Sequence, residues 1–340
     1  MNSLAAAEST TLDVLDRQIV RSLQLNPRAP FRRIGEALGV SEQTIARRYR
    51  ALYRDGVLHV VGMVNTTALG ESDWLIRIRS RPDATLDLGR ALSQRPDISW
   101  VNVTGGGSEI VCAVRSHTSE TREHLLIDRL PRTSAVLDVT ASVILRHFLG
   151  GSASGWLGVS DVLTAAQELL LRTDLPSRVP ARGVHTLERS DYAMLDELAR
   201  DGRASFSTLA KAAGTSEARA TRRLSTLLDA GVVYIDIDLA AATLGFPISA
   251  YLWLSVAPGR LDATCRALTK HVETPFVAAI SGRENVVASV TCRTLDELYR
   301  YVTERVGPIE GVQSIEVSPV LRRMKQAGTL VDNGRLMTRR

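Results

Sequence analysis

Long apolar runs, cysteine and leader-like segments are scarce or missing in this sequence of 340 residues. No stretch of about 18 uncharged apolar residues occurs, so no transmembrane helix is expected. The N-terminal residues lack a basic region followed by a long apolar one, so we expect no secretory signal and a cytoplasmic protein. The three cysteines, Cys112, Cys265 and Cys292, lie far apart. This spacing argues against a disulfide framework and a paired-cysteine zinc site, and we expect buried thiols.

Signatures of catalysis and of cofactor binding are missing as well. The six histidines have no metal-ligand spacing. No phosphate-binding loop, dinucleotide fingerprint or nucleophile elbow occurs. The carboxylates are scattered, without a pair suited to acid–base catalysis. We therefore expect no metal, no cofactor and no enzymatic activity.

Lysine is the third shortage, since the 42 basic residues include only three lysines. The formal net charge is +5, which permits a nucleic-acid partner without requiring one. An excess of arginine also arises from genome composition, so charge alone leaves both interpretations open.

The chain contains an internal repeat. A shift of 175 residues aligns its two halves without a gap over about 55 positions. The matches include Arg28-Ala29 with Arg203-Ala204, Ser41-Glu42 with Ser216-Glu217, Arg47-Arg48 with Arg222-Arg223, and Gly56-Val57 with Gly231-Val232. Two copies of one unit of about 140 residues are therefore expected.

Each copy begins with a helical segment. In the first copy, the spacing of apolar residues predicts helices over residues 13–25 and 31–38. Gly39 favours the end of the second helix, and Ser41 caps a third helix that runs to Arg54. Residues 57–64 are rich in β-branched side chains and predict a strand. The tight turn between the second and third helices is typical of a helix-turn-helix.

The third helix carries a polar stripe opposite its apolar face. Ile45, Tyr49 and Leu52 cluster on one side, whereas long hydrogen-bond donors lie on the other. A helix that reads a DNA groove needs such donors; the alternative is a merely solvated face. The predicted DNA-binding residues are Arg32, Arg33, Ser41, Gln43, Thr44, Arg47, Arg48, Arg50 and Arg54 in the first copy, and Ser216, Arg219, Arg222 and Arg223 in the second.

The rest of each copy reads as a βαββαβ segment, the ferredoxin-like arrangement. The fold class is therefore α+β, with two tandem units, each a winged-type helix-turn-helix domain followed by a ferredoxin-like domain. The predicted divisions are helix-turn-helix domains at 11–64 and 187–240, ferredoxin-like domains at 70–148 and 245–325, and a linker at 149–186. Within the linker, Ser160 is expected to cap a short helix that ends at Arg172.

This combination resembles the leucine-responsive regulatory protein/AsnC family of transcription regulators. The resemblance rests on Leu38-Gly39-Val40-Ser41 followed by Arg47-Arg48, on Gly56-Val57, on Leu69-Gly70 and on Val103-Thr104-Gly105. It covers both copies, so the chain resembles a fused tandem member. It implies a sequence-specific DNA-binding regulator of double-stranded DNA, in which one chain supplies both half-site readers as a covalent pseudo-dimer. It also implies a homo-oligomer, a dimer or tetramer of chains, without a membrane partner.

The resemblance further implies a small effector, an amino acid or a related metabolite, bound near the middle turn of the ferredoxin-like domains. Backbone N–H groups of such a turn suit a carboxylate, and Glu109 is expected to receive an ammonium group. A plain hairpin turn is the alternative. Glu109 and Asn285 stand where the family commonly has Asp. The predicted effector-binding residues are Thr104, Gly105, Gly106, Ser108 and Glu109 in the first copy, and Ser281, Gly282 and Asn285 in the second.

The two copies differ in charge. Residues 12–64 carry nine arginines and five acidic residues, whereas residues 187–239 carry seven basic and nine acidic residues. Since phosphate neutralisation dominates DNA affinity, we expect the first reader to supply most of the grip. Arg219, Arg222 and Arg223 could still suffice for the second. An architectural protein that binds DNA with little sequence preference remains the alternative function, and RNA binding is disfavoured because the strands lack interleaved aromatics.

Overall fold

The computed structural model describes residues 12–115, 124–130, 132–149, 156–172 and 185–337. It begins with three helices, α1 (Val14–Leu25), α2 (Phe31–Leu38) and α3 (Glu42–Arg54). Asp13 caps α1, Gly39 ends α2 in the left-handed conformation, and Ser41 accepts a hydrogen bond from the backbone of Thr44 at the start of α3. These are the ends that the sequence predicts. Among the described helices, none is long and apolar enough to span a membrane.

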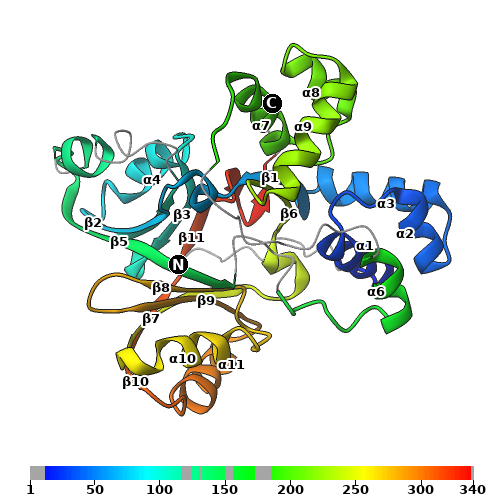
Figure 1. The fold of residues 1–340 in the computed structure, drawn as a ribbon. Helices are drawn as coiled ribbons and strands as arrows, with labels where there is room; N and C mark the ends of the chain where they lie inside the picture. The colour runs from blue at the N-terminus through cyan, green and yellow to red at the C-terminus, as the bar shows by residue number, and fades with distance from the viewer. Residues whose placement is uncertain (1–11, 116–123, 131, 150–155, 173–184, 338–340) are drawn as a thin grey trace.

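The second copy repeats these elements. Its helices are α7 (Arg189–Arg200), α8 (Phe206–Ala212) and α9 (Glu217–Asp229). The strands that follow the two helical segments, β1 (Leu58–Val64) and β6 (Val233–Leu239), pair with each other in antiparallel fashion. Val61 lies opposite Asp236, its own counterpart 175 residues on. The ribbon therefore lies on a pseudo-two-fold axis, and both helix-turn-helix domains extend from it (Figure 1).

Each ferredoxin-like domain forms a four-stranded antiparallel sheet. The first has the spatial order β5-β2-β4-β3 and the second β10-β7-β9-β8. The first sheet contains β2 (Trp74–Ser80), β3 (Ile98–Thr104), β4 (Glu109–Val114) and β5 (Val136–Leu149), with α4 (Thr85–Ser93) and a π-helical turn at His124–Arg129. The second contains β7 (Ile248–Val256), β8 (Phe276–Ile280), β9 (Val286–Cys292) and β10 (Val312–Pro319), with α10 (Leu261–Leu268), α11 (Leu295–Arg300) and a π-helical turn at Tyr301–Val306.

The two sheets pack against each other within one chain. Leu75 and Val111 of the first sheet share a buried cluster with Trp253 and Ile280 of the second. The helices cover the outer faces, with α4 on one side and α10 and α11 on the other (Figure 1). Cys112, Cys265 and Cys292 are buried and unbridged, as predicted. The expected pseudo-dimer is thus the architecture of a single chain.

Three features differ from the sequence predictions. The alternating sequence predicts a last strand that ends at Leu145, but strand β5 extends to Leu149 because its last residues pair with β8 of the second unit. The equivalent continuation after β10 is a separate strand, β11 (Arg322–Gln326), which crosses to β3 of the first unit and leads into β12 (Thr329–Asp332) and β13 (Arg335–Leu336). The linker helix α6 (Ala165–Arg172) begins after Thr164, not Ser160, whose hydroxyl instead donates to Leu157 O at 2.7 Å.

The described part of the predicted linker packs on the first helix-turn-helix domain. Glu168 of α6 accepts a 2.6 Å hydrogen bond from Arg21 of α1, and Leu171 is fully buried. The indole of Trp156 packs edge-on against Phe246, with ring centroids 5.1 Å apart. In the first ferredoxin-like domain the sequence predicts that Thr118 caps a helix running to about Leu130, and Thr118 lies outside the described residues.

Candidate nucleic-acid interface and interior cavity

Helix α3 presents a polar face to solvent. Ile45 and Leu52 are buried, and Tyr49 packs on Phe31 of α2 with ring centroids 5.2 Å apart. The exposed positions of this helix are Glu42, Gln43, Arg47, Arg50 and Arg54, and Arg32 of α2 is exposed as well. Arg54 pairs with Asp55 and Arg32 with Glu36, both at 2.8 Å. Arg47 and Arg50 make no ion pair within the described chain, and they are the side chains best placed to bind phosphates.

Arg48, which the sequence predicts to contact DNA, instead contacts the first helix of its own domain. It forms ion pairs of 2.6 Å with Asp13 and 3.1 Å with Asp16, both at the start of α1. Arg223 makes the equivalent bond to Asp191 at 2.6 Å. Both arginines therefore hold the recognition helix against the first helix of its domain. Three other predicted DNA-binding residues make hydrogen bonds within their own helix. Ser41 and Ser216 accept backbone hydrogen bonds at the starts of α3 and α9, and the hydroxyl of Thr44 is hydrogen-bonded to that of Ser41.

Helix α9 presents a weaker version of the polar face. Arg219 and Arg222 are exposed, but Ser225 and Asp229 occupy the positions that correspond to Arg50 and Arg54. The structure also shows that part of the negative charge of this domain lies away from the reading face. Asp236 and Asp238 are buried on β6, at 4% and 2% exposure. The difference between the two readers therefore lies mainly in the side chains of the recognition helices.

A reciprocal pair of arginines joins the two helix-turn-helix domains. Arg28 donates to the carbonyls of Gly202 and Ala204 at 2.6 and 2.9 Å. Arg203, its counterpart, donates to the carbonyls of Pro27 and Ala29 at 2.7 and 2.9 Å.

Each of these guanidinium groups also lies over the first aromatic residue of the opposite second helix. Arg28 lies 5.3 Å from the ring of Phe206, and Arg203 lies 4.4 Å from that of Phe31. We call the Arg28 and Arg203 contacts the arginine clamp. The clamp fixes the two readers relative to each other, so their separation is a built-in property of the monomer.

The middle turn of the first ferredoxin-like domain exposes backbone but not its acidic side chain. Gly105, Gly106 and Gly107 form a short 3₁₀ turn with positive φ angles of 56°, 65° and 98°. The carboxylate of Glu109 is only 7% exposed and accepts from Arg77 at 2.8 Å and from Thr104 at 2.7 Å. Each oxygen of Glu109 therefore already accepts one hydrogen bond, so the predicted contact with an ammonium group would use the remaining lone pairs of a largely buried carboxylate.

The corresponding turn of the second domain is occupied by structural hydrogen bonds. Asn285 accepts from the backbone N–H of Val256 at 2.9 Å and donates to its carbonyl at 2.7 Å. The hydroxyl of Ser281 accepts from the backbone of Val143, across the junction between the sheets. Gly282 has a φ of 120° beside them. Ser281 therefore helps to join the two units and Asn285 holds the turn to β7, whereas Arg283 of the same turn is exposed.

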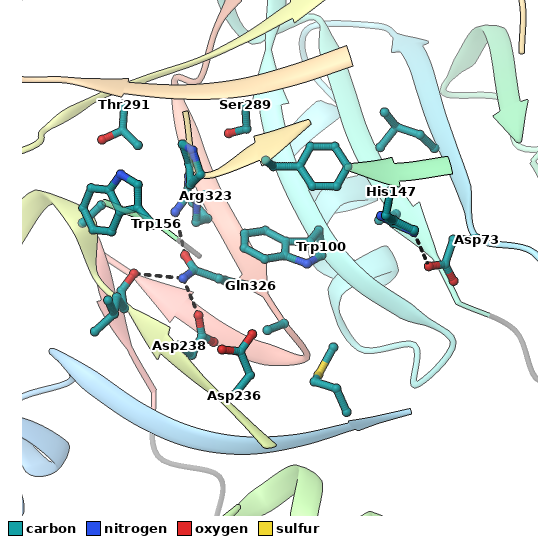
Figure 2. A pocket seen from close by; sticks show the side chains of 18 of the residues that line it. Asp73, Trp100, His147, Trp156, Asp236, Asp238, Ser289, Thr291, Arg323 and Gln326 are labelled. Carbon is teal, nitrogen blue, oxygen red and sulfur yellow. Dashed lines mark hydrogen bonds and ion pairs between the residues drawn. The ribbon is translucent and has the colours of Figure 1, made fainter. Parts of the chain in front are cut away.

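The structure contains an interior cavity that the sequence patterns did not reveal. It has a volume of about 130 Å³ and lies between the β1–β6 ribbon, both sheets and β11. One end holds Asp73, whose carboxylate accepts from His147 Nε2 at 3.0 Å and lies 3.6 Å from Arg115 (Figure 2). Burial opposes ionisation there, but the charges of Arg115 and His147 outweigh it and hold the pKa of Asp73 at about 2. The other end holds Asp236, Asp238, Arg323 and Gln326.

Comparison with known proteins agrees with this architecture. The AsnC-type helix-turn-helix domain family matches residues 12–52 and again residues 187–228. The Lrp/AsnC ligand binding domain family matches residues 249–330. The HTH-type transcriptional regulator FL11 of Pyrococcus abyssi is 32% identical over 112 residues, which are 32% of this chain and 74% of that protein. The chain belongs to the Lrp/AsnC family of transcription regulators. The doubled helix-turn-helix match makes it a tandem member.

Other relatives extend the likeness. An uncharacterised HTH-type transcriptional regulator of the same organism is 28% identical over 143 residues, covering 42% of this chain and 90% of that protein. Among solved structures, the siroheme decarboxylase NirDL aligns with 91% of this chain and 92% of its own, with a TM-score of 0.60 and 14% identity. At that identity the likeness shows the two-unit fold alone.

Proposed function

We propose that this family member is a sequence-specific DNA-binding regulator in which one chain carries both half-site readers. The observation that carries the proposal is the antiparallel pairing of β1 with β6 about Val61 and Asp236. This pairing relates α3 to α9 by a pseudo-two-fold axis, and paired helix-turn-helix readers bind half-sites arranged about a two-fold axis. The arginine clamp then sets the half-site separation without a second chain.

The two readers grip DNA unequally in this proposal. Arg47 and Arg50 on α3 are exposed and lack ion pairs within the described chain, whereas α9 has Arg222 and Ser225 at the same positions. Each neutralised phosphate adds roughly 0.9 to the slope of log affinity against log salt. The first half-site should therefore supply more of the salt dependence than the second, and the full site should consist of two unlike halves.

A salt titration of matched variants tests the asymmetry. Arg47→Ala should weaken DNA binding and reduce the slope of log affinity against log salt by roughly one. Arg222→Ala should cause a smaller loss of affinity and a smaller reduction of this slope. Arg300→Ala, a surface substitution on α11 with the same loss of charge, is the control and should leave both unchanged. Equal losses for Arg47→Ala and Arg222→Ala would refute unequal readers.

We also propose that the ferredoxin-like domains bind a small effector at the turn of Gly105–Gly107. The support is twofold. The second ferredoxin-like domain, of which the first is the repeat, matches the ligand binding domain family over residues 249–330, and the three consecutive positive φ angles of this turn expose backbone N–H groups that suit a carboxylate. Because Glu109 is already bonded, recognition would rest on the backbone. Calorimetric titration with amino acids should give saturable heat, and a flat response across the panel would favour the plain hairpin turn.

Assembly beyond the monomer completes the proposal. Leu145 after the middle of β5 and Leu321 after β10 are counterparts in the two units, and they are 65% and 68% exposed. Exposed apolar side chains related by symmetry suit contacts between copies of the chain. Leu145→Asp with Leu321→Asp should reduce the mass measured by light scattering to that of one chain, and an unchanged mass would place the contact elsewhere.

A further inference from the structure

The interior cavity has the shape and lining of a ligand site. Trp100, Trp156 and Phe276 contribute aromatic walls, and Met63 and Leu75 contribute aliphatic ones. Its volume of about 130 Å³ compares with the roughly 150 Å³ of an apolar cavity that holds benzene. The cavity therefore accommodates one ring or one branched chain, together with a small polar group.

One polar group at the edge of this cavity has unused bonding capacity. Asp238 on β6 is 2% exposed, and its Oδ1 accepts from the amide of Gln326 on β11. Its Oδ2 is buried and makes no hydrogen bond of normal geometry among the described residues, although the hydroxyl of Thr329 on β12 lies near enough to favour the ionised form of the carboxyl group. A buried carboxylate oxygen without a donor is costly, so this atom is the place where a ligand contributes most. Figure 2 shows Asp238 beside Gln326 at the cavity wall.

The neighbouring cation already has its own partners. Arg323 on β11 donates to Asn102 at 3.3 Å and to Gln326 at 2.6 Å, and its guanidinium lies 5.7 Å from the ring of Trp100. Asp236 places a second carboxylate at the same end of the cavity. This end therefore holds two carboxyl groups beside Arg323, and the charge of Arg115 also acts on Asp236. The Oδ2 atom of Asp238 is an acceptor once the carboxyl group is ionised, and a cation next to it favours that ionised form. A ligand that brings a positively charged donor fits it better than one that brings a second acceptor.

We propose that this cavity binds a small hydrophobic amine, with its ammonium group against Asp238 and its apolar body among Trp100, Trp156 and Phe276. The site is distinct from the turns of Gly105 and Gly282. One wall of the cavity is the β1–β6 ribbon, which connects the two helix-turn-helix domains. A bound ligand therefore contacts the element that joins the two recognition helices. Binding itself does not depend on the proposed DNA-reading function.

The titration behaviour of the site agrees with this assignment. Burial raises the pKa of Asp238 to about 8, although Gln326 and Arg323 on β11 and Thr329 on β12 oppose the rise, while Asp236 on its own strand adds to it. An arriving ammonium group favours the ionised carboxylate. Amine binding should therefore release a proton near neutral pH and tighten as the pH rises toward 8.

The test uses phenethylamine and isoamylamine as probes of the full-length protein, by calorimetry and tryptophan fluorescence. Both should bind saturably, and Asp238→Asn should weaken them roughly tenfold to a hundredfold, the range expected for one charged hydrogen bond. Asp296→Asn on the surface of α11 is the charge-matched control and should bind like the parent. Ser289→Leu, which narrows the cavity, should abolish binding in a protein that still melts cooperatively.

Two analogues separate this site from the effector turn. 3-Phenylpropionate, which has a carboxylate in place of the amine, should not bind the cavity. Phenylalanine should bind only at the turn of Gly105–Gly107, so its heat of binding should be insensitive to Asp238→Asn. Absence of saturable amine binding, or binding that Asp238→Asn and Ser289→Leu leave unchanged, would overturn the proposal, as would equal binding of 3-phenylpropionate.

Discussion

The arginine clamp should be the main source of rigidity between the two DNA readers. Arg28→Ala removes two charge-assisted hydrogen bonds to carbonyls and one contact with the ring of Phe206. Hydrogen bonds to charged groups contribute about 1.5–3 kcal/mol each, and part of that loss is recovered when water reaches the carbonyls. We therefore expect a loss of about 2–4 kcal/mol in the free energy of unfolding. Arg203→Ala should cost a similar amount, because the pseudo-two-fold axis relates its contacts to those of Arg28.

The two substitutions should not be additive. Both act on one interface, so the second costs less once the first has loosened it. Urea unfolding of the single and double variants measures this coupling, and Arg28→Lys serves as the matched control because it keeps the charge but not the planar fork. The loosened double variant should also tolerate a wider range of half-site spacings. A loss below about 0.5 kcal/mol in each single variant, typical of an ordinary surface substitution, would refute the clamp.

Two predictions concern buried carboxylates with opposite pH dependence. The pKa of Asp73 is about 2 in the folded protein, below its ordinary value of 3.8. Ionised Asp73 therefore adds its full contribution to the free energy of unfolding above about pH 4, and this contribution is lost as the pH falls through about 2. Asp73→Asn should therefore cost about 2 kcal/mol in urea unfolding at pH 7 and little at pH 2; an equal cost at both would exclude the ionic explanation. Asp238 has a folded pKa of about 8, so the wild-type protein loses stability as the pH rises from about 4 to 8. Asp238→Asn should raise the melting temperature more at pH 8 than at pH 5, and a pH-independent difference would contradict the assignment.

Local patterns predicted the elements near each helix-turn-helix closely. The predicted ends at Leu25, Leu38 and Arg54 agree with α1, α2 and α3, because each is set by a cap or a glycine within a few residues. The succession of strands and helices along each ferredoxin-like domain also followed from local hydrophobic periodicity. These signals are short in range, and the repeat supplied a second independent reading of each.

Contacts between the copies were harder to predict. The predicted second ferredoxin-like domain ends at residue 325, and nothing local in residues 322–326 indicates that they add a strand to β3 of the other unit. The contacts of Arg48 were also not predictable from local sequence. Its position on the helix is compatible with DNA contact, but its side chain forms ion pairs with Asp13 and Asp16. The cavity is the clearest case. Its walls come from both sheets, the ribbon and β11, so Asp238 and Trp100 become neighbours only after the whole chain has folded.

Selection of genomic fragments by the purified protein at near-physiological salt tests the central claim most directly. The wild-type protein should recover a few discrete sites, each built of two unlike half-sites at one fixed spacing. Arg47→Ala with Arg50→Ala should lose them, and Arg300→Ala should recover the same set. Uniform recovery of fragments that fades with rising salt would contradict a sequence-specific pseudo-dimer and favour an architectural DNA-binding protein.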